Sequence, residues 1–269
     1  MSRGVHGTPP VAPAASNRSA AAPRVSVIMP VHNGERFIRQ AIDNVRAQGC
    51  PGVEVILVDD GSTDASMHIA SDCGPLRCLA QENAGPAAAR NRGLAAAVGE
   101  YIAFLDVDDA WPSDLLERLA AILDASPGID IVQGTVQDVT PAGDAAADGH
   151  ARRGGPYRSV NLGSALYRRA AFERVGEFDP QLRFNEDTDW FCRAWSGRVW
   201  KQRIEEVALF YLRHEENMTL AEDSRRAGFA RVIGKHAIAS RSARPAPEGF
   251  PSLADYLGWS DSVHRNGAR

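Results

Sequence analysis

The chain has 269 residues, of which 44% are hydrophobic and 24% charged, and its formal net charge is −4. This composition is typical of globular proteins, and the length suits one large α/β domain or two small ones. The weak negative charge argues against a nucleic-acid partner, and no apolar stretch is long enough to predict a membrane-spanning helix.

Residues 1–23 are rich in Pro, Ala, Ser and Gly and contain almost no large apolar side chains. Such a segment cannot bury enough surface to offset its ordering entropy, so we predict a disordered tail and an ordered chain from Arg24 onward. The tail lacks the apolar core of a signal peptide, and the cysteines form no C-x-x-C pair. We therefore expect a cytoplasmic location and buried or half-buried thiols at Cys50, Cys73, Cys78 and Cys192.

Strands and helices alternate in the first part of the chain. Helical spacing of apolar residues predicts helices at 35–48 and 86–98, and a short helix after Asp64. Nearly continuous apolar runs predict strands at 25–31, 53–58, 101–105 and, more weakly, 76–79. This alternation predicts an α/β fold with a mainly parallel, Rossmann-like sheet flanked by helices, in which function lies at the carboxyl ends of the strands.

The second part of the chain is less regular. Its apolar patterns predict strands at 129–139, 162–167 and 207–212, and helices at 112–125, 169–175, from residue 184 onward and at 222–240. Residues 140–155 are rich in Asp, Gly and Ala, and we expect a mobile loop there. A Pro-rich C-terminal extension follows.

Polar or acidic residues follow three successive predicted strands: Asn33 and Glu35, then Asp59 and Asp60, then Asp106 and Asp108. The last two would share one face if the backbone stays extended, and paired carboxylates suit Mg²⁺ or Mn²⁺ with a substrate phosphate. The alternative is that they cap the helix near Pro112. Asp60 either accepts a hydrogen bond from a nucleobase or belongs to a turn that caps a helix.

Four further residues have both a structural and a functional interpretation. Arg90 lies on a helix of small residues and either stays solvated or reaches the strand ends. Glu186 and Asp187 open a helix, as partners of its dipole or as a general base and its neighbour. His214 follows the last strand, where it is either an ordinary histidine or part of the site. Motifs of P-loop kinases, dinucleotide dehydrogenases, α/β-hydrolases and zincins are absent from the sequence.

Four blocks, in this order and spacing, resemble the family 2 glycosyltransferases of the GT-A fold. They are VSVIMPVHNGERFIRQAIDNVRAQ, VEVILVDDGSTDAS, NAGPAAARNRGLAAAVGEYIAFLDVDDAWPSDLL and GSALYRRAAFERVGEFDPQLRFNEDTDWFCRA. The resemblance covers about residues 24–215. It implies a metal-dependent, inverting transfer of a sugar from a nucleotide-diphosphate sugar, with UDP as the expected nucleotide, to an acceptor hydroxyl.

The resemblance also implies a role for each candidate residue. Asp187 would be the catalytic base with Glu186 supporting it. Asp108 would bind Mn²⁺ or Mg²⁺, and His214 would lie near the metal or the diphosphate. The nucleotide pocket, with Asp60 at the base and Asp106 near the ribose, would be formed by Pro30, Val31, Asn33, Glu35, Asp59, Asp60 and Asp106, and we add Arg90 to it. Val107 departs from the small residues common in the family and leaves both flanking acids intact.

The same resemblance implies an organisation of the chain and its partners. A single GT-A domain would span 24–240, and 241–269 would be a C-terminal extension. Within the domain we expect a nucleotide-binding half, an acceptor half and a helix at 24–110, 111–220 and 221–240. The acceptor would be a saccharide, a lipid-linked molecule or a protein, with peripheral membrane contact left open. The alternatives are a nucleotidyltransferase, which the segment HNGERF in place of a phosphate loop disfavours, and a non-catalytic sugar-nucleotide-binding domain.

Overall fold

The computed structural model describes residues 22–141, 150–214 and 247–259, together with 229, 232 and 234–236. The predicted tail therefore lies outside the described residues except for its last two positions, as do residues 142–149 of the predicted loop and most of the helix predicted at 222–240. The described residues of that helix are helical.

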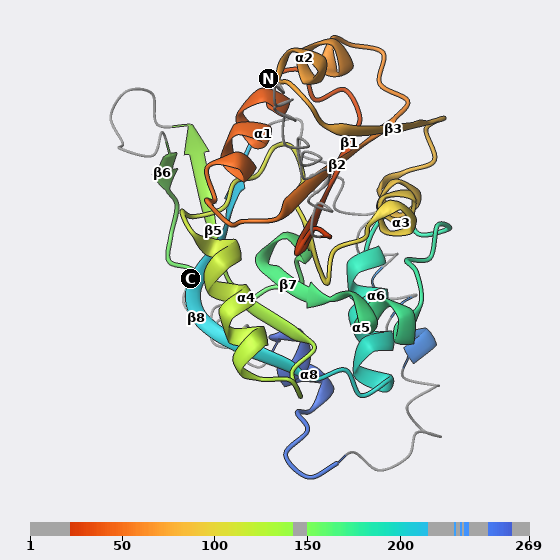
Figure 1. The fold of residues 1–269 in the computed structure, drawn as a ribbon. Coiled ribbons are helices and arrows are strands. Elements are labelled where there is room, and N and C mark those ends of the chain that lie inside the picture. Colours follow the sequence, from red (N-terminus) through yellow and green to blue (C-terminus); the bar gives the residue numbers. More distant parts are fainter. Residues whose placement is uncertain are drawn as a thin grey trace, which may run out of the picture.

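An eight-stranded mixed sheet forms the centre of the molecule (Figure 1). Its strands are β1 (Val25–Val31), β2 (Val53–Asp60), β3 (Arg77–Gln81), β4 (Tyr101–Phe104), β5 (Ile131–Pro141), β6 (His150–Arg152), β7 (Ala165–Arg168) and β8 (Lys201–Leu212). The order is β3-β2-β1-β4-β7-β5-β6, and β8 pairs with β5. The β1–β2, β1–β4, β2–β3 and β5–β8 pairs are parallel, whereas β7 runs antiparallel between β4 and β5. The predicted α/β fold with a mostly parallel sheet is confirmed.

Helices cover both faces of this sheet. One core contains apolar residues of α1 (Ile38–Arg46), α2 (Ser66–Asp72) and α4 (Leu115–Ala125). The other core contains residues of α3 (Pro86–Ala96), α5 (Arg169–Val175), α6 (Glu186–Ser196) and α8 (Leu253–Leu257). Figure 1 shows α1 and α4 on one side of the sheet and α3, α5 and α6 on the other.

The alternation along β1 explains why its sequence is apolar throughout. Val25, Val27 and Met29 belong to the first core, and Ile28 belongs to the second. Successive side chains of a strand point to opposite faces, so a strand covered on both sides needs apolar residues at nearly every position. The apolar run of β1 is thus the sequence signature of a central strand.

Several element boundaries differ from the sequence prediction. Residues 150–152 of the predicted loop form β6, which pairs antiparallel with β5. β8 begins at Lys201, before the predicted Val207, because its first half is mostly half-buried and carries polar side chains that mask the apolar pattern. The predicted strand at 162–167 begins as a 3-10 turn, at 162–164. Of the four cysteines, which are all free thiols, Cys78 is exposed and the others are buried or half-buried as expected.

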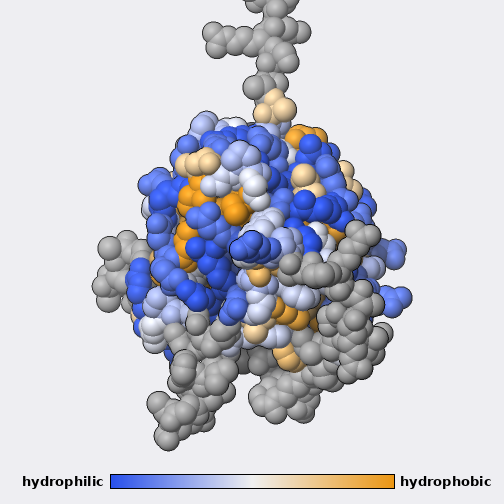
Figure 2. Space-filling model, turned by 90° about the horizontal axis from the view of Figure 1, so that it is seen from below, coloured by the Kyte–Doolittle hydropathy of each residue, from blue (hydrophilic) through white to orange (hydrophobic). Residues whose placement is uncertain are grey.

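The C-terminal segment around α8 packs against α6. Tyr256 and Leu257 are fully buried in the second core, and Trp195 Nε1 donates a hydrogen bond to the carbonyl of Pro251 at 3.0 Å. Figure 2 shows the lower face of the molecule as mostly hydrophilic, with apolar patches that polar side chains separate. Within the described residues, no helix combines the length and apolar character needed to cross a membrane.

Candidate active site

The loops after β1 and β2 hold each other at the carboxyl end of the sheet. Asn33 has a left-handed backbone with φ of +53°, a conformation that asparagine tolerates better than most residues. Its Oδ1 accepts a hydrogen bond from the amide of Thr63 at 2.8 Å, and Glu35 Oε2 accepts one from the amide of Ala65 at 3.0 Å. Asn33 and Glu35 therefore shape this rim by bonding the neighbouring loop. Val31 is buried in the first core and Pro30 is half-buried, so Val31 supports the rim from beneath.

Asp60 organises the loop that leads into α3. It is almost fully buried, and its two oxygens accept hydrogen bonds from the amides of Ala84 and Gly85 at 2.8 and 2.9 Å. A third bond comes from Gln81 Nε2 at 2.8 Å. Asp59 similarly accepts the amide of Ser62 at 2.8 Å. Both acids thus order backbone at the strand end, and the role of Asp60 at a nucleobase stays a prediction.

Arg90 connects the two halves of the chain. It is 6% exposed, and it donates to Asp106 Oδ1 at 2.7 Å and to Glu186 Oε1 at 2.6 Å. Burial opposes its charge, but these two carboxylates outweigh burial and raise the pKa of Arg90 above its ordinary value. The position of α3 makes this reach possible, because a Cβ on Gly93 would lie 2.4 Å from Ile28 Cγ2. Glycine therefore lets α3 sit directly on β1.

Asp187 lies beside this ion pair at the start of α6. Its Oδ1 accepts hydrogen bonds from the amide and the hydroxyl of Thr188, at 2.6 and 3.2 Å. Burial first, and the neighbouring charge of Glu186 second, raise the pKa of Asp187 to about 7. A carboxyl group with such a pKa can exchange a proton near neutral pH, which is the property of a general base or acid.

Asp108, in the turn after β4, lies beside His214, which follows β8. The ring Nε2 of His214 lies 3.1 Å from Asp108 Oδ2, and the ring packs on Phe37 with a centroid distance of 4.8 Å. Burial and the charge of Asp106 raise the pKa of Asp108. The backbone turns between the two acids, since the amide of Asp109 donates to the carbonyl of Asp106 at 3.0 Å.

Two expectations for the 106–108 segment are therefore wrong. The segment is not extended, so its acids bond different partners: Asp106 bonds Arg90, and Asp108 bonds His214. The two acids do not cap the helix predicted near Pro112 either, because α4 begins at Leu115 and its N-cap residue is Asp114.

The donor chemistry at Asp108 and His214 fits a divalent cation. A carboxylate and an imidazole suit Mn²⁺, and Mg²⁺ is commonly held by one or two carboxylates together with substrate phosphates. No group of three metal-ligating side chains occurs in the described part of the chain, so a cation here would take its other oxygens from water or a substrate. The surrounding acids, whose main positively charged neighbour is Arg90, give the site a negative charge. A bound metal ion would balance that charge.

Two residues of this region, Asp109 and His32, were not predicted as site residues from the sequence. Asp109 is 6% exposed and accepts the amide of Leu212 at 3.1 Å, which ties the end of β4 to the end of β8. The ring of His32 lies 2.9 Å from the carbonyl of Asp60 and contacts the amide group of Asn83. Their positions in the sequence could have indicated them, because His32 directly follows β1 and Asp109 directly follows the other acids.

A family model and individual relatives point to the same protein family. The model of the family described as Glycosyl transferase family 2 matches residues 26–176. EpsJ of Bacillus subtilis (strain 168), an uncharacterized glycosyltransferase, is 31% identical over 220 residues, covering 73% of this chain and 63% of the relative. An uncharacterized glycosyltransferase of Nostoc sp. (strain PCC 7120) is 29% identical over 218 residues, covering 72% of this chain and 66% of the relative. The chain thus spans slightly less than two thirds of each relative's length.

Solved structures share the fold. Staphylococcus aureus TarS 1–349, in complex with UDP-GlcNAc, superposes with a TM-score of 0.67 at 21% identity, covering 90% of this chain and 74% of that one. The mannosyltransferase PcManGT of Pyrobaculum calidifontis, in complex with GDP-Man and Mn²⁺, superposes with a TM-score of 0.64 at 21% identity, covering 93% and 77%. At this identity the likeness establishes the fold.

Proposed function

The chain belongs to glycosyl transferase family 2, and on that premise we propose that it transfers a sugar from a nucleotide-diphosphate sugar to an acceptor hydroxyl with inversion. The observation that carries this proposal is the bridge from Asp106 through Arg90 to Glu186. It places the helix that begins with Glu186 and Asp187 beside the carboxyl ends of the central strands, where α/β sheets bind their ligands.

The donor would lie across these strand ends, with a UDP-sugar as the first candidate. The rim residues Asn33 and Glu35 and the loop that Asp60 orders would surround the nucleotide, and Asp106 would face its ribose. Complexes of related folds with UDP-GlcNAc and with GDP-Man support a nucleotide-sugar donor. UDP itself is a proposal that rests on the resemblance of the sequence blocks.

Asp108 and His214 would hold Mn²⁺ or Mg²⁺ together with the donor diphosphate. When bound, such a cation neutralises the diphosphate charge and makes it a better leaving group. The Mn²⁺ in the complex of PcManGT supports the use of a divalent cation by this fold.

Asp187 would act on the acceptor. As a carboxylate it takes the proton of the acceptor hydroxyl while that oxygen attacks the anomeric carbon from the side opposite the diphosphate. The new bond to the acceptor oxygen forms as the bond to the diphosphate oxygen breaks, and the nucleoside diphosphate leaves with the electron pair. Glu186, held by Arg90 at 2.6 Å, would keep the first turn of α6 in place. One attack without a covalent intermediate inverts the anomeric configuration.

The acceptor class and the location of the protein stay predictions. A saccharide, a lipid-linked molecule or a protein would each supply the hydroxyl that this chemistry needs. A cytoplasmic location likewise rests on the sequence alone.

A donor panel tests the proposal. The full chain would be incubated with UDP-, GDP-, CDP- and dTDP-sugars, with Mn²⁺ and with EDTA, and release of nucleoside diphosphate would be measured. We expect metal-dependent release from one nucleotide class, with water serving as a slow acceptor. Nucleoside diphosphate release that Asp187→Asn leaves unchanged would contradict the proposal. The proposal would also fail if no donor released nucleoside diphosphate and no nucleotide bound.

A further inference from the structure

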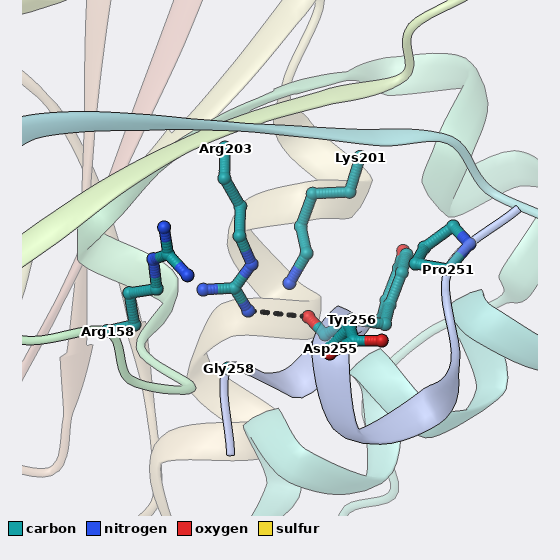
Figure 3. A pocket seen from close by; sticks show the side chains of 7 residues that line it. All are labelled: Arg158, Lys201, Arg203, Pro251, Asp255, Tyr256 and Gly258. Carbon is teal, nitrogen blue, oxygen red and sulfur yellow. Dashed lines mark hydrogen bonds between the residues drawn. The ribbon is translucent and has the colours of Figure 1, made fainter. Parts of the chain in front are cut away.

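A cavity of about 240 Å³ lies where the start of β8 meets the segment around α8 (Figure 3). Its lining comes from Arg158, Lys201 and Arg203 on one side and from Pro251, Asp255, Tyr256 and Gly258 on the other. Lys201 begins β8, whereas His214 follows the other end of that strand. The cavity and the candidate active site therefore lie at opposite ends of β8.

The lining is strongly basic. Three of its side chains are basic and one, Asp255, is acidic. Arg158 also pairs with Glu205, whose side chain is 75% exposed, and an ion pair with so exposed a partner is weak. Figure 3 shows the guanidinium groups of Arg158 and Arg203 turned toward one another, with the Lys201 amine directed to the same space. Like charges gathered in this way favour an anion between them.

Lys201 shows how strongly this environment acts on a cation. Its Nζ donates to Gln133 Oε1 at 2.9 Å and lies 4.5 and 4.3 Å from the ring centroids of Phe191 and Tyr256. Burial first, and the charge of Arg203 second, lower the pKa of Lys201 well below its ordinary value. A bound anion would stabilise the protonated amine and so raise this pKa again.

The backbone near α8 holds Arg203 and leaves room beside it. The carbonyl of Tyr256 accepts a hydrogen bond from Arg203 Nη2 at 2.7 Å. Gly258 has a left-handed φ of +80°, and a Cβ there would lie 2.7 Å from Arg203 Nη1. A glycine thus suits the left-handed turn, and the carbonyl of Tyr256 orients the guanidinium before any ligand arrives.

We propose that this cavity binds a phosphate group, held by the guanidinium groups of Arg158 and Arg203 and by the charge of Lys201. Planar guanidinium groups match the oxygens of phosphate with paired hydrogen bonds. The cavity exceeds what a single water needs, so it has room for such an anion. The phosphate could belong to a small soluble molecule or to a lipid headgroup. This inference goes beyond the proposed function and does not depend on it.

Calorimetry of the full chain with inorganic phosphate, in EDTA to silence the metal-dependent site, tests the proposal. A second arm measures co-sedimentation with phosphatidylcholine vesicles that contain or lack phosphatidic acid. The variants are Arg158→Gln and Arg203→Gln, and the matched control is Arg118→Gln. Arg118 pairs with Glu206 of β8, at 3.2 Å, and lies outside the cavity lining. Thermal unfolding shows whether each variant remains folded, and Arg158→Gln keeps the test valid if Arg203→Gln does not fold.

We expect saturable binding in at least one arm, weakened at least about tenfold by either cavity variant and unchanged by Arg118→Gln, since each lost bond to a charged partner is of that size. Binding of inorganic phosphate identifies a soluble ligand, and binding of phosphatidic acid vesicles alone identifies a headgroup. No saturable binding in either arm, or binding that all three variants weaken equally, would overturn the proposal.

Discussion

The carboxyl group of Asp187 lies at the first turn of α6, where an acid also stabilises a helix through its dipole. Three acids share this turn, and the structure distinguishes them by their partners. Glu186 is engaged by Arg90, and Asp189 is engaged by Arg193, Lys235 and His236. Within the part of the chain that the structure describes, Asp187 accepts hydrogen bonds only from its neighbour Thr188. It is the acid of this turn best suited to accept a proton.

Asp187→Asn tests this assignment. The amide keeps the size of the side chain and removes the proton acceptor, so we expect transfer to fall between about 100-fold and 10,000-fold while donor affinity stays near wild type. Initial rates and donor calorimetry give the two quantities. Glu186→Gln is the matched control and is expected to cost less, because its role is to orient the turn. Retention of more than about a tenth of wild-type turnover by Asp187→Asn would rule out the base assignment.

The pH dependence follows from the same group. Its pKa is raised to about 7 by burial and by Glu186, and the base must be deprotonated to act. We therefore expect kcat/KM for the donor panel's best substrate to rise with pH up to about 7 and to level off above it. The rise should be absent from the residual activity of Asp187→Asn. A wild-type profile that is flat across this range would mean that another group takes the proton.

Among the helices, α6 is held in place by a cluster of charged side chains around the buried Asp189. Asp189 is fully buried, and it accepts from Arg193 Nε at 2.8 Å and from Lys235 Nζ and His236 Nε2 at 3.0 Å. Burial alone would raise the pKa of Asp189, but the three donors outweigh it and lower that pKa below the ordinary value. The cluster therefore joins the helix that carries Asp187 to residues 235 and 236 of the C-terminal part.

Asp189→Asn should destabilise the protein. The substitution removes the buried charge that accepts bonds from Arg193, Lys235 and His236, and the loss of hydrogen bonds to a charged group costs about 2 kcal/mol in the free energy of unfolding. Urea unfolding measures it. The control is Asp179→Asn, because Asp179 reaches the same Lys235 at 3.7 Å from a side chain that is 33% exposed, and such pairs contribute about 1 kcal/mol or less. Equal losses for the two variants would refute the cluster's special role.

The sequence predicts the central elements well and the contacts of the site poorly, for physical reasons. A strand covered on both faces needs an apolar run, so β1, β2 and β4 are legible in the chain. The half-exposed start of β8 has no such signature. The bond from Arg90 to Glu186 joins residues 96 positions apart, and that from His214 to Asp108 joins residues 106 apart. Such contacts depend on the strand order, which local patterns do not determine.

At the scale of the whole molecule, the C-terminal segment is part of the second core. Tyr256 and Leu257 are 1% and 0% exposed, and Phe250, Leu253 and Trp259 pack against the same cluster. The basic cavity also involves this segment, whereas the charge cluster of Asp189 involves the preceding residues 235 and 236. The C-terminal segment therefore supports α6 by packing against it, whereas the candidate active site lies at the strand ends.

Deleting the residues after 246 should lower stability substantially. The loss of two fully buried side chains corresponds to roughly 3–6 kcal/mol, which thermal unfolding would register as a lower Tm. The comparison is a chain that begins at Pro23, which we expect to keep the wild-type Tm because the composition of residues 1–23 predicts no packed structure. An unchanged Tm after the C-terminal deletion would mean that the segment contributes nothing to the core.

Calorimetry of UDP and GDP, with and without Mn²⁺, shows whether the carboxyl ends of the strands bind a nucleoside diphosphate with a metal at Asp108 and His214. We predict that Mn²⁺ strengthens binding of one nucleotide to the wild-type chain and that Asp108→Asn, while still folded, loses this enhancement. Asp114→Asn, at an exposed position before α4, should keep it. Mn²⁺-enhanced binding that survives in Asp108→Asn would mean that Asp108 does not hold the cation.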